Sequence, residues 1–279
     1  MSEPSPTAGA GDVFEEALAL FTPARLLANP LATGEGVRVA LIDTGVDRKV
    51  IEARSRARGN VIHPLQGAVF LPGKAEPLPY EGQQSSPHGT TVADIVLSLA
   101  PRVQLYSADV FGPSASSDVE MLIRALHHAM DVWNCKIINL SLGISEERLQ
   151  VIQRRQQLYR AIQEAYFRGI IVVAATHNDH PLVRSYPSLF APPLISVNKA
   201  LFDDPLTLRY ALDEHVEFLA HGRGYLGPFA QEPATSWAAP HLTAIVARLL
   251  SLRPSLKLFE VKTILYWMSN RTKEPETGN

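Results

Sequence analysis

The sequence is short of several features that would place it in a specialised class of protein. Its 279 residues include a single cysteine, Cys135, which excludes an internal disulfide and a cysteine-based metal cluster. The longest apolar run, residues 169–175, is far shorter than the roughly 18 residues of a membrane-spanning helix. Neither sign of charge dominates, since 26 basic residues face 28 acidic ones. We therefore expect neither a nucleic acid nor a membrane as a partner.

The start of the sequence lacks the pattern of a secretory signal. Residues 1–11 are rich in Ser, Pro, Ala and Gly and have no basic start followed by an apolar core. Together with the lone cysteine, which fits a reducing compartment, this favours a cytoplasmic protein. We expect flexible tails at residues 1–12 and 271–279, and one domain over residues 13–270, because no long linker divides the chain.

What the sequence does contain is an alternation of strand-like and helix-like segments. Short β-branched runs predict strands at residues 37–42, 103–110, 136–142, 169–175 and 194–197. Apolar residues at helical spacing predict helices at residues 14–21, 88–100, 117–133, 146–167, 236–252 and 256–268, the third opened by a capping box at Ser117. Residues 48–87 show no sustained period and are expected to be loop with short strands. The alternation predicts an α/β fold with a mostly parallel central sheet and helices on both faces.

Three polar residues stand where such a fold places its ligands, beyond the carboxyl ends of the strands. Asp43 directly follows the first predicted strand, and His88 and Ser236 each stand where a helix begins. A serine hydroxyl becomes a strong nucleophile when an imidazole removes its proton, and a buried carboxylate holds that imidazole in one tautomer. The helix dipole at His88 disfavours imidazolium, so a carboxylate partner is needed there, which Asp43 could supply. These residues are the candidate catalytic group.

The same chemistry needs donors for a developing oxyanion. The free amides at the start of the helix that carries Ser236 can supply one. Loss of a single such donor typically costs about 2.7–4 kcal/mol of transition-state stabilisation, so a second donor is expected. Asn178, just past the strand that ends at Ala175, is the candidate.

Five segments in order resemble the subtilisin-like serine proteases, or subtilases. The segments VALIDTGVD (residues 39–47), HGTTVA (88–93) and TSWAAPH (235–241) resemble the segments of that family that carry its catalytic Asp, His and Ser. INLSLG (138–143) resembles the strand that lines the primary specificity pocket, and VAATHN (173–178) the oxyanion-asparagine segment. The resemblance covers roughly residues 15–270. Within that range, the loop at residues 186–188 also resembles a loop of the family.

The resemblance implies a subtilisin-like fold and a serine endopeptidase with an acyl-enzyme intermediate. Asp43, His88 and Ser236 would be catalytic and Asn178 an oxyanion donor. We expect no cofactor and no metal. The substrate would be a dedicated peptide or protein, lying extended against Ser141, Leu142 and Gly143, with residues 114–116 as a second flank. Two alternatives remain open: a peptide-binding protein of the same fold without turnover, and a peptide ligase or macrocyclase that resolves the acyl-enzyme with an amine.

Two short stretches set the chain apart from many members of that family. Only residues 98–102 separate the His88 helix from the next strand, where others insert a calcium-binding loop, so tight calcium binding is not expected. The roughly 30 residues before the first strand are too few for a folded inhibitory propeptide. A pocket that is selective for its substrate, or a regulatory partner protein, would then restrain the activity.

Single residues also depart from the pattern of the family. Thr91 replaces a histidine, and Asp94, Ala234 and His177 stand where glycine is common. Ile144 also replaces a glycine and is expected to narrow the primary pocket, which favours small or medium apolar side chains in the substrate.

Other candidate residues have ordinary structural interpretations. Asp47 is expected in a turn, His127 and His128 on a helix surface, and Cys135 in the core. The pair His177 and His180 lacks an evident third zinc ligand. A basic cluster is expected to be a solvated loop face, with a site for an acidic partner as the alternative; it comprises Arg48, Lys49, Arg54, Arg56 and Arg58.

Overall fold

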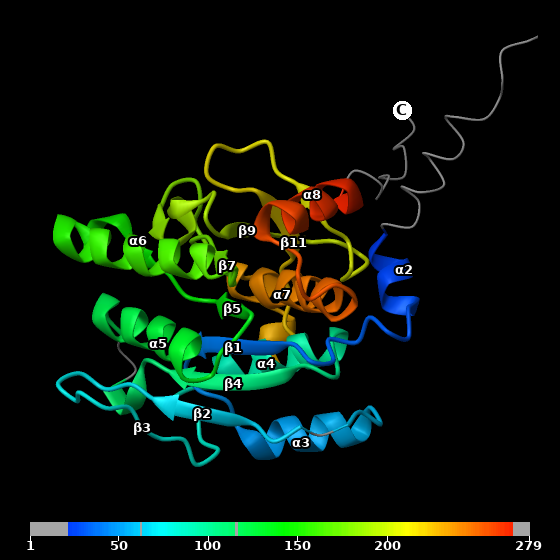
Figure 1. Cartoon of the computed structure of the whole chain (residues 1–279), viewed down its shortest axis with the longest axis horizontal. Coiled ribbons are helices and arrows are strands. Elements are labelled where there is room, and N and C mark those ends of the chain that lie inside the picture. The colour runs from blue at the N-terminus through cyan, green and yellow to red at the C-terminus, as the bar shows by residue number, and fades with distance from the viewer. Residues whose placement is uncertain (1–21, 62, 115–116, 270–279) are drawn as a thin grey trace, which may run out of the picture.

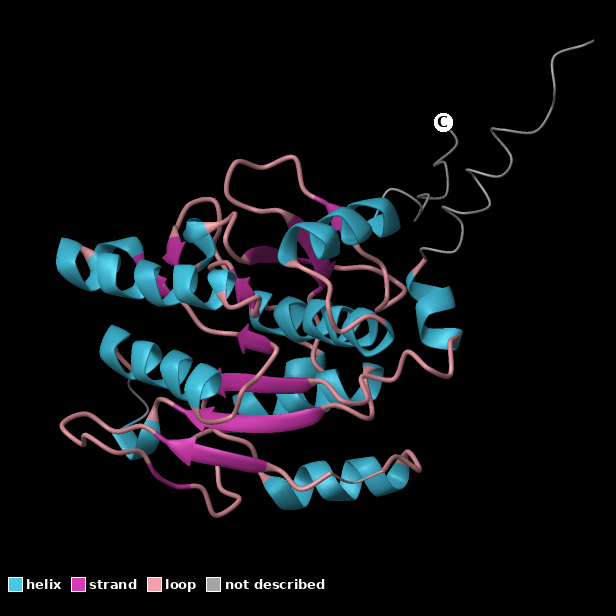
Figure 2. Ribbon diagram, viewed as in Figure 1, coloured by secondary structure: helices cyan, strands magenta, loops and turns pink. Residues whose placement is uncertain are grey.

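The computed structural model describes residues 22–61, 63–114 and 117–269. Within them, nine strands form one sheet with helices packed against it (Figure 1, Figure 2). The predicted tails at residues 1–12 and 271–279 and the predicted helix at residues 14–21 lie outside the described residues. So does most of the proposed second substrate flank, residues 114–116. In the described part of the chain, no helix is long and apolar enough to cross a membrane.

The sheet is parallel except at its two edges. In order across the sheet, the strands are β10 (Arg209–Tyr210), β11 (Phe218–His221), β9 (Ile195–Ala200), β7 (Ile171–Ala175), β5 (Ile137–Leu140), β1 (Arg38–Asp43), β4 (Gln104–Asp109), β2 (Gln66–Val69) and β3 (Leu78–Pro79). Only the pairs of β10 with β11 and of β2 with β3 are antiparallel. This confirms the predicted α/β fold with a mostly parallel sheet.

Both faces of the sheet are buried, which explains why its strands read as continuous apolar runs. Along β1, Val39 and Leu41 point into one core cluster while Ala40 and Ile42 point into the other. Helices α5 (Val119–Asp131) and α6 (Ile152–Phe167) cover the second cluster and lie side by side in Figure 1. The first cluster is covered by α2 (Pro23–Ala28), α3 (Arg48–Ala57), α4 (Pro87–Leu99), α7 (Thr235–Leu252) and α8 (Leu258–Ser269).

The interpretation of residues 48–87 as loop with short strands was wrong for residues 48–57, which form α3; between α3 and α4 the described residues are loop with the short strands β2 and β3, as predicted. The side chain of Asp47 caps α3 by accepting a hydrogen bond of 3.1 Å from the amide of Val50. The basic cluster therefore lies along α3, with Arg58 at its C-cap, and several of its members are not simply solvated. Arg54 and Arg58 donate to the fully buried carboxylate of Asp94, at 2.9–3.0 Å and 2.7 Å. That pairing accounts for the acidic residue at a position where glycine was expected.

Two predicted helices also differ in detail. The segment predicted as one helix over residues 146–167 is split into the 3₁₀ turn η2 (Glu146–Leu149) and α6. At the start of α5, Asp118 is the cap in place of Ser117, because its carboxylate accepts from two backbone amides. The other short elements are η1 (Gly112–Ser114), β6 (Ile144–Ser145), β8 (Ser185–Tyr186), η3 (Ser188–Phe190) and η4 (Gly227–Ala230).

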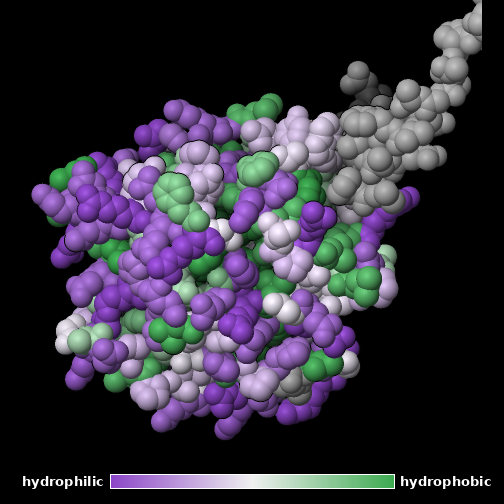
Figure 3. Space-filling view, viewed as in Figure 1, coloured by the Kyte–Doolittle hydropathy of each residue, from purple (hydrophilic) through white to green (hydrophobic). Residues whose placement is uncertain are grey.

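Cys135 lies in the core, as predicted, and burial raises the pKa of its thiol to about 12. The two neighbouring histidines on α5 face in different directions. The surface interpretation holds for His127, whose side chain is 41% exposed, but not for His128. The ring of His128 packs edge-on against Phe70 and Trp133, with ring centroids 5.5 Å and 4.7 Å apart. The face of the molecule shown in Figure 3 is mostly hydrophilic, with apolar residues in separate groups.

A buried arginine ties the start of the described chain to the core. Arg248, in α7, is 7% exposed, and its guanidinium donates to the carbonyl groups of Leu26, Leu27, Ala32 and Leu99. These carbonyls belong to α2, the turn after it and the last turn of α4. One side chain therefore satisfies groups that the fold would otherwise bury without a hydrogen-bond partner.

We expect Arg248→Met to destabilise the fold. Each buried carbonyl left without a donor costs about 1–3 kcal/mol. Water can hydrate some of the four carbonyls and so reduce the total cost, and we therefore expect the free energy of unfolding to fall by about 3 kcal/mol. Urea denaturation followed by circular dichroism measures this. The control is Arg253→Met, at the exposed end of α7, which should change stability by less than about 0.5 kcal/mol. Equal stability of the two variants would contradict the assignment.

Candidate active site

The carboxyl ends of the four central parallel strands meet at one edge of the sheet. Asp43 is the last residue of β1, and the chain leaves β4, β5 and β7 at the same edge. A cleft of about 360 Å³ opens there. It is lined by Asp43, Thr44, Ser85, Ser86, His88, Phe111, Ser141, Leu142 and Gly143. The predicted catalytic Asp and His thus share one cleft with the three predicted substrate-binding residues.

Asp43 and His88 are joined by a hydrogen bond. The Nδ1 atom of His88 lies 2.7 Å from Oδ1 of Asp43, which also accepts the amide of Thr44 at 2.7 Å. Asp43 is 1% exposed, so its charge acts with little screening by water. Because Nδ1 faces a carboxylate, it carries a proton, and Nε2 is the nitrogen left free to accept one.

The local sequence explains how His88 reaches Asp43. Ser86 caps α4, Pro87 opens it, and His88 follows in the first turn. The amide of Gly89 then donates to the hydroxyl of Thr44 at 3.0 Å, which joins the loop after β1 to α4. A Cβ atom at Gly89 would lie only 2.1 Å from the carbonyl oxygen of Gly45. Only glycine permits this approach, which brings the imidazole to the carboxylate.

The environment of His88 raises its pKa above the ordinary value. Burial lowers the pKa, but the negative charge of Asp43 and the hydrogen bond to it raise the pKa by more. The ring also lies against the indole of Trp237, with centroids 4.8 Å apart and planes inclined by 36°. Phe229 meets the same ring edge-on at 6.4 Å. Sequence reasoning had missed both aromatic residues, although Trp237 directly follows the candidate nucleophile.

Ser236 stands in the first turn of α7, as predicted, but its hydroxyl is not hydrogen-bonded to His88. It donates to the carbonyl of Ser141 at 3.0 Å, and the hydroxyl of Ser141 donates to the carbonyl of Ser236 at 2.9 Å. This reciprocal pair fastens the start of α7 to the end of β5. The preceding Ala234 has extended backbone with φ −141°, so the alanine in place of glycine is accommodated without strain.

Asn178 lies beyond the end of β7 and is tied to the residue before Ser236. Its Oδ1 atom accepts the backbone amide of Thr235 at 2.8 Å, while the hydroxyl of Thr235 donates to the carbonyl of Thr176 at 2.7 Å. The candidate oxyanion donor is therefore fastened to the first turn of α7, beside the amide of Ser236. The structure brings together, at one edge of the sheet, the residues that the sequence predicted for the site.

The remaining departures from the expected pattern leave the Asp43–His88 pair intact. The hydroxyl of Thr91 donates to the carbonyl of Pro87 at 3.1 Å inside α4. Ile144 pairs with Tyr186 through β6 and β8 and packs against the second core cluster; it follows Gly143 directly but is not itself among the residues that line the cleft. A narrower primary pocket therefore stays a prediction.

The histidines at residues 177–180 have local partners. Nδ1 of His177 accepts the amide of Asp179 at 3.1 Å, and Nε2 of His180 lies 3.3 Å from Oδ2 of Asp213. In the described ranges, no three His, Cys, Asp or Glu side chains gather closely enough to hold a metal ion.

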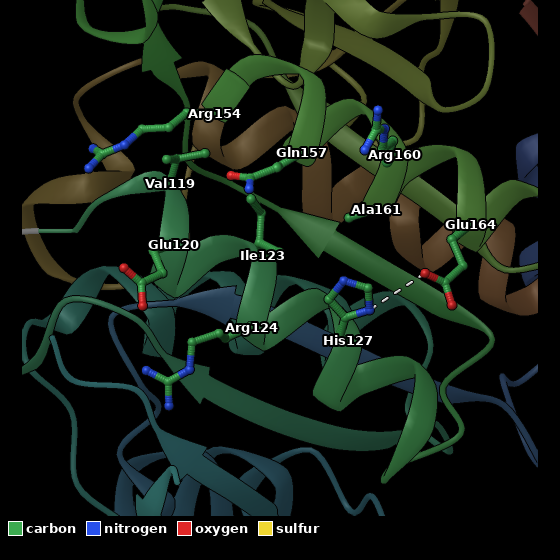
Figure 4. A pocket seen from close by; sticks show the side chains of 10 residues that line it. All are labelled: Val119, Glu120, Ile123, Arg124, His127, Arg154, Gln157, Arg160, Ala161 and Glu164. Atoms are coloured by element: carbon green, nitrogen blue, oxygen red, sulfur yellow. Dashed lines mark ion pairs between the residues drawn. The ribbon is translucent and has the colours of Figure 1, made fainter. Parts of the chain in front are cut away.

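Figure 4 shows another hollow, of about 520 Å³, between α5 and α6. Arginines 124, 154 and 160 line it, and Nδ1 of His127 lies 3.6 Å from a carboxylate oxygen of Glu164 across one end. None of its lining residues carries a hydroxyl or a thiol. Because nucleophilic catalysis needs such a group beside a base, the Asp43–His88 cleft is the candidate active site.

Comparison with known proteins shows the family to which the chain belongs. The sequence profile of the subtilase family matches residues 34–211. Alkaline elastase YaB from Bacillus sp. (strain YaB) is 30% identical over 251 residues, which cover 84% of this chain and 59% of that protein. The chain thus spans about three fifths of the length of that relative. It belongs to the subtilase family.

Solved structures agree with the fold. Sphericase superposes with a TM-score of 0.63 at 23% identity, covering 83% of this chain and 82% of that one. The crystal structure of a lanthipeptide protease superposes with a TM-score of 0.62 at 19% identity, covering 94% of this chain and 90% of that one. Both show that the subtilisin-like fold extends over most of the chain.

We expect the imidazole of His88 to titrate above the ordinary histidine value of 6.5. In Asp43→Asn its pKa should fall below that of the wild type, because burial then acts without the opposing charge. NMR of histidine-labelled protein across a pH series measures both. The control is Asp47→Asn, which removes a carboxylate that caps α3 and should leave the titration of His88 nearly unchanged. An equal pKa in wild type and Asp43→Asn would refute the electrostatic coupling.

Proposed function

We propose that this protein is a serine endopeptidase that hydrolyses peptide bonds through an acyl-enzyme intermediate. The observation that carries the proposal is the 2.7 Å hydrogen bond between His88 and the buried Asp43, beside the first turn of α7 where Ser236 stands. Membership of the subtilase family supports the same reaction. Asp43, His88 and Ser236 are the proposed catalytic residues.

The first half of the reaction forms the acyl-enzyme. Rotation of the Ser236 side chain turns its hydroxyl from the carbonyl of Ser141 towards Nε2 of His88. His88 takes the hydroxyl proton as the Ser236 oxygen attacks the peptide carbonyl, and the carbonyl oxygen becomes an oxyanion. When the tetrahedral intermediate collapses, the C–N bond breaks and His88 gives its proton to the leaving amine. The acyl group stays on Ser236 as an ester.

The second half restores the enzyme. A water molecule gives a proton to His88 and attacks the ester carbonyl, and a second tetrahedral intermediate forms, which carries the oxygen of the water. Its collapse breaks the bond to Ser236, whose oxygen takes the proton back from His88, so that the acid product leaves and the hydroxyl is restored. The carboxylate of Asp43 stabilises the imidazolium that forms twice in each cycle.

The oxyanion would be held by two donors, the backbone amide of Ser236 and the side-chain NH₂ of Asn178. The amide of Ser236 belongs to the first turn of α7, where free amides and the helix dipole favour negative charge, and Asn178 is hydrogen-bonded to that turn from beyond β7. Because Asn178 is tied to the amide of Thr235 at 2.8 Å, its position relative to that of Ser236 is set before substrate arrives. Such preorganisation is what makes an oxyanion hole effective.

The cleft supports an extended peptide as the substrate. Ser141, Leu142 and Gly143 line it just beyond β5 and offer backbone groups for strand-like pairing. We infer a dedicated peptide or protein substrate in place of general digestion. The similarity in fold to a lanthipeptide protease, over 94% of this chain, is compatible with a processing role. The side chain accepted in the primary pocket is proposed to be small or medium and apolar, on account of Ile144.

A second candidate function is peptide binding without turnover. The observation that favours it is the hydrogen bond of Ser236 to Ser141 in place of His88. In that case the nucleophile would stay engaged at the end of β5, and a bound peptide would leave unchanged.

We expect a fluorophosphonate probe to label the wild-type protein at Ser236, because the probe reacts only with a serine hydroxyl that a base has activated. Ser236→Ala should abolish labelling, and peptide mapping by mass spectrometry should locate the adduct. The control is Ser98→Ala, in α4, whose hydroxyl donates to its own helix at Asp94 and lies outside the lining of the cleft. Folded wild-type protein that is not labelled would favour the binding function instead.

A further inference from the structure

The side-chain amide of Asn178 has one determined orientation. Its outer atom facing Thr235 receives a backbone N–H at 2.8 Å, and the same atom lies 3.5 Å from Nζ of Lys199. An N–H and an ammonium are both donors, so the atom they approach must be the oxygen Oδ1. The NH₂ group of Asn178 therefore points the other way, and it has no hydrogen-bond partner among the residues the structure describes.

Lys199 contacts Asn178 at two atoms. It is the second-last residue of β9, and its Nζ donates to the backbone carbonyl of Asn178 at 2.9 Å, in addition to the approach to Oδ1. The lysine therefore bridges the main chain and the side chain of the proposed oxyanion donor. In the described part of the chain no carboxylate forms an ion pair with Lys199, so its charge is not neutralised locally.

Backbone hydrogen bonds connect the end of β9, where Lys199 lies, to the segment that precedes Ser236. The amide of Gly222 donates to the carbonyl of Ala200 at 2.9 Å, and the amide of Ala234 donates to the carbonyl of Gly222 at 2.9 Å. A Cβ atom at Gly222 would lie 2.7 Å from Cβ of Lys199, so glycine allows this segment to approach the strand closely. Lys199 is thereby held against the segment that begins α7.

We propose that Lys199 is a positioning residue for the oxyanion hole. It fixes the amide of Asn178 with the NH₂ group free for substrate, and it places a positive charge on the oxygen side of that amide. The charge polarises the amide so that its NH₂ group becomes a stronger donor to the developing oxyanion. This role rests on the proposed function. A lysine that only ends a strand would have no such role.

The test compares rate constants for labelling of Ser236 by the fluorophosphonate probe, whose phosphoryl oxygen gains negative charge as the serine attacks. Lys199→Met keeps the length of the side chain without its charge, and we expect the rate constant to fall about tenfold. That loss is smaller than the roughly 10²–10³ typical of losing an oxyanion donor itself. Lys199→Arg keeps the charge and should retain most of the rate. The control is Lys257→Met, at an exposed lysine before α8.

A double variant decides whether Lys199 acts through Asn178. If it does, Lys199→Met should cost little in an Asn178→Ala background, because the amide that it positions is already absent. Losses that multiply in the double variant would overturn the positioning role. So would a rate for Lys199→Met equal to that of Lys257→Met.

A readout without turnover separates this inference from the proposed function. In ¹⁵N-labelled wild-type protein, the side-chain NH₂ of Asn178 should give the relaxation of a rigid group, and in Lys199→Met it should become mobile. An equally rigid amide in Lys199→Met would overturn the inference whether or not the protein is labelled. Absence of labelling in the wild type, with the amide responding as expected, would instead count against the endopeptidase function alone.

Discussion

The hydrogen bond between His88 and Asp43 is the contact on which the candidate site depends, and the whole centre of the fold contributes to it. It forms only because the loop after β1 and the first turn of α4 approach within a distance that a side chain at Gly89 would prevent. The parallel sheet supplies Asp43 at the end of β1, next to the central strand β5, where both faces of the sheet are covered and the residue is 1% exposed. In that environment one carboxylate is sufficient to outweigh the effect of burial on the pKa of the imidazole.

The nucleophile side of the site is built from a different part of the core. Helix α7 is buried along nearly all of its length, so its position is fixed by packing and not by the chemistry at its first turn. Two strand ends then hold that turn. The end of β5 holds it through the reciprocal hydrogen bonds of Ser141 and Ser236, and the residues after β7 hold it through Asn178 and Thr235. The His and Ser sides are thus anchored to neighbouring strands of one sheet, which keeps their relative positions constant.

The parts of the fold that sequence could predict are those with a strong local signal. The central strands were predicted because burial on both faces leaves continuous apolar runs, and α7 because it is apolar nearly throughout. Helix α3 was missed because only Ile51 and Ser55 are buried in it, so its apolar period is almost absent. Its true signal was Asp47 as a cap. The contact of Lys199 with Asn178 could not be predicted, since it joins a residue of β9 to the loop after β7 and leaves no pattern in the sequence. The same holds for the hydrogen bond of Ser236 to Ser141.

The site has a charged group at each of its two ends: a carboxylate beside the proposed general base and an ammonium beside the proposed oxyanion donor. A buried carboxylate, Asp43, lies on one side of the imidazole, and in the proposed mechanism it would stabilise the cation that forms when His88 takes a proton. The ammonium of Lys199 lies on the oxygen side of the amide of Asn178, and in the proposed mechanism it would stabilise the anion that forms at the same moment. Each charged group acts through one intervening polar group and is held by main-chain contacts, so neither has to reorganise as the reaction proceeds. In the proposed mechanism, fixed charges of opposite sign would therefore stabilise both ends of the developing dipole, and the charge at the oxyanion end would come from β9, a strand that carries none of the proposed catalytic residues.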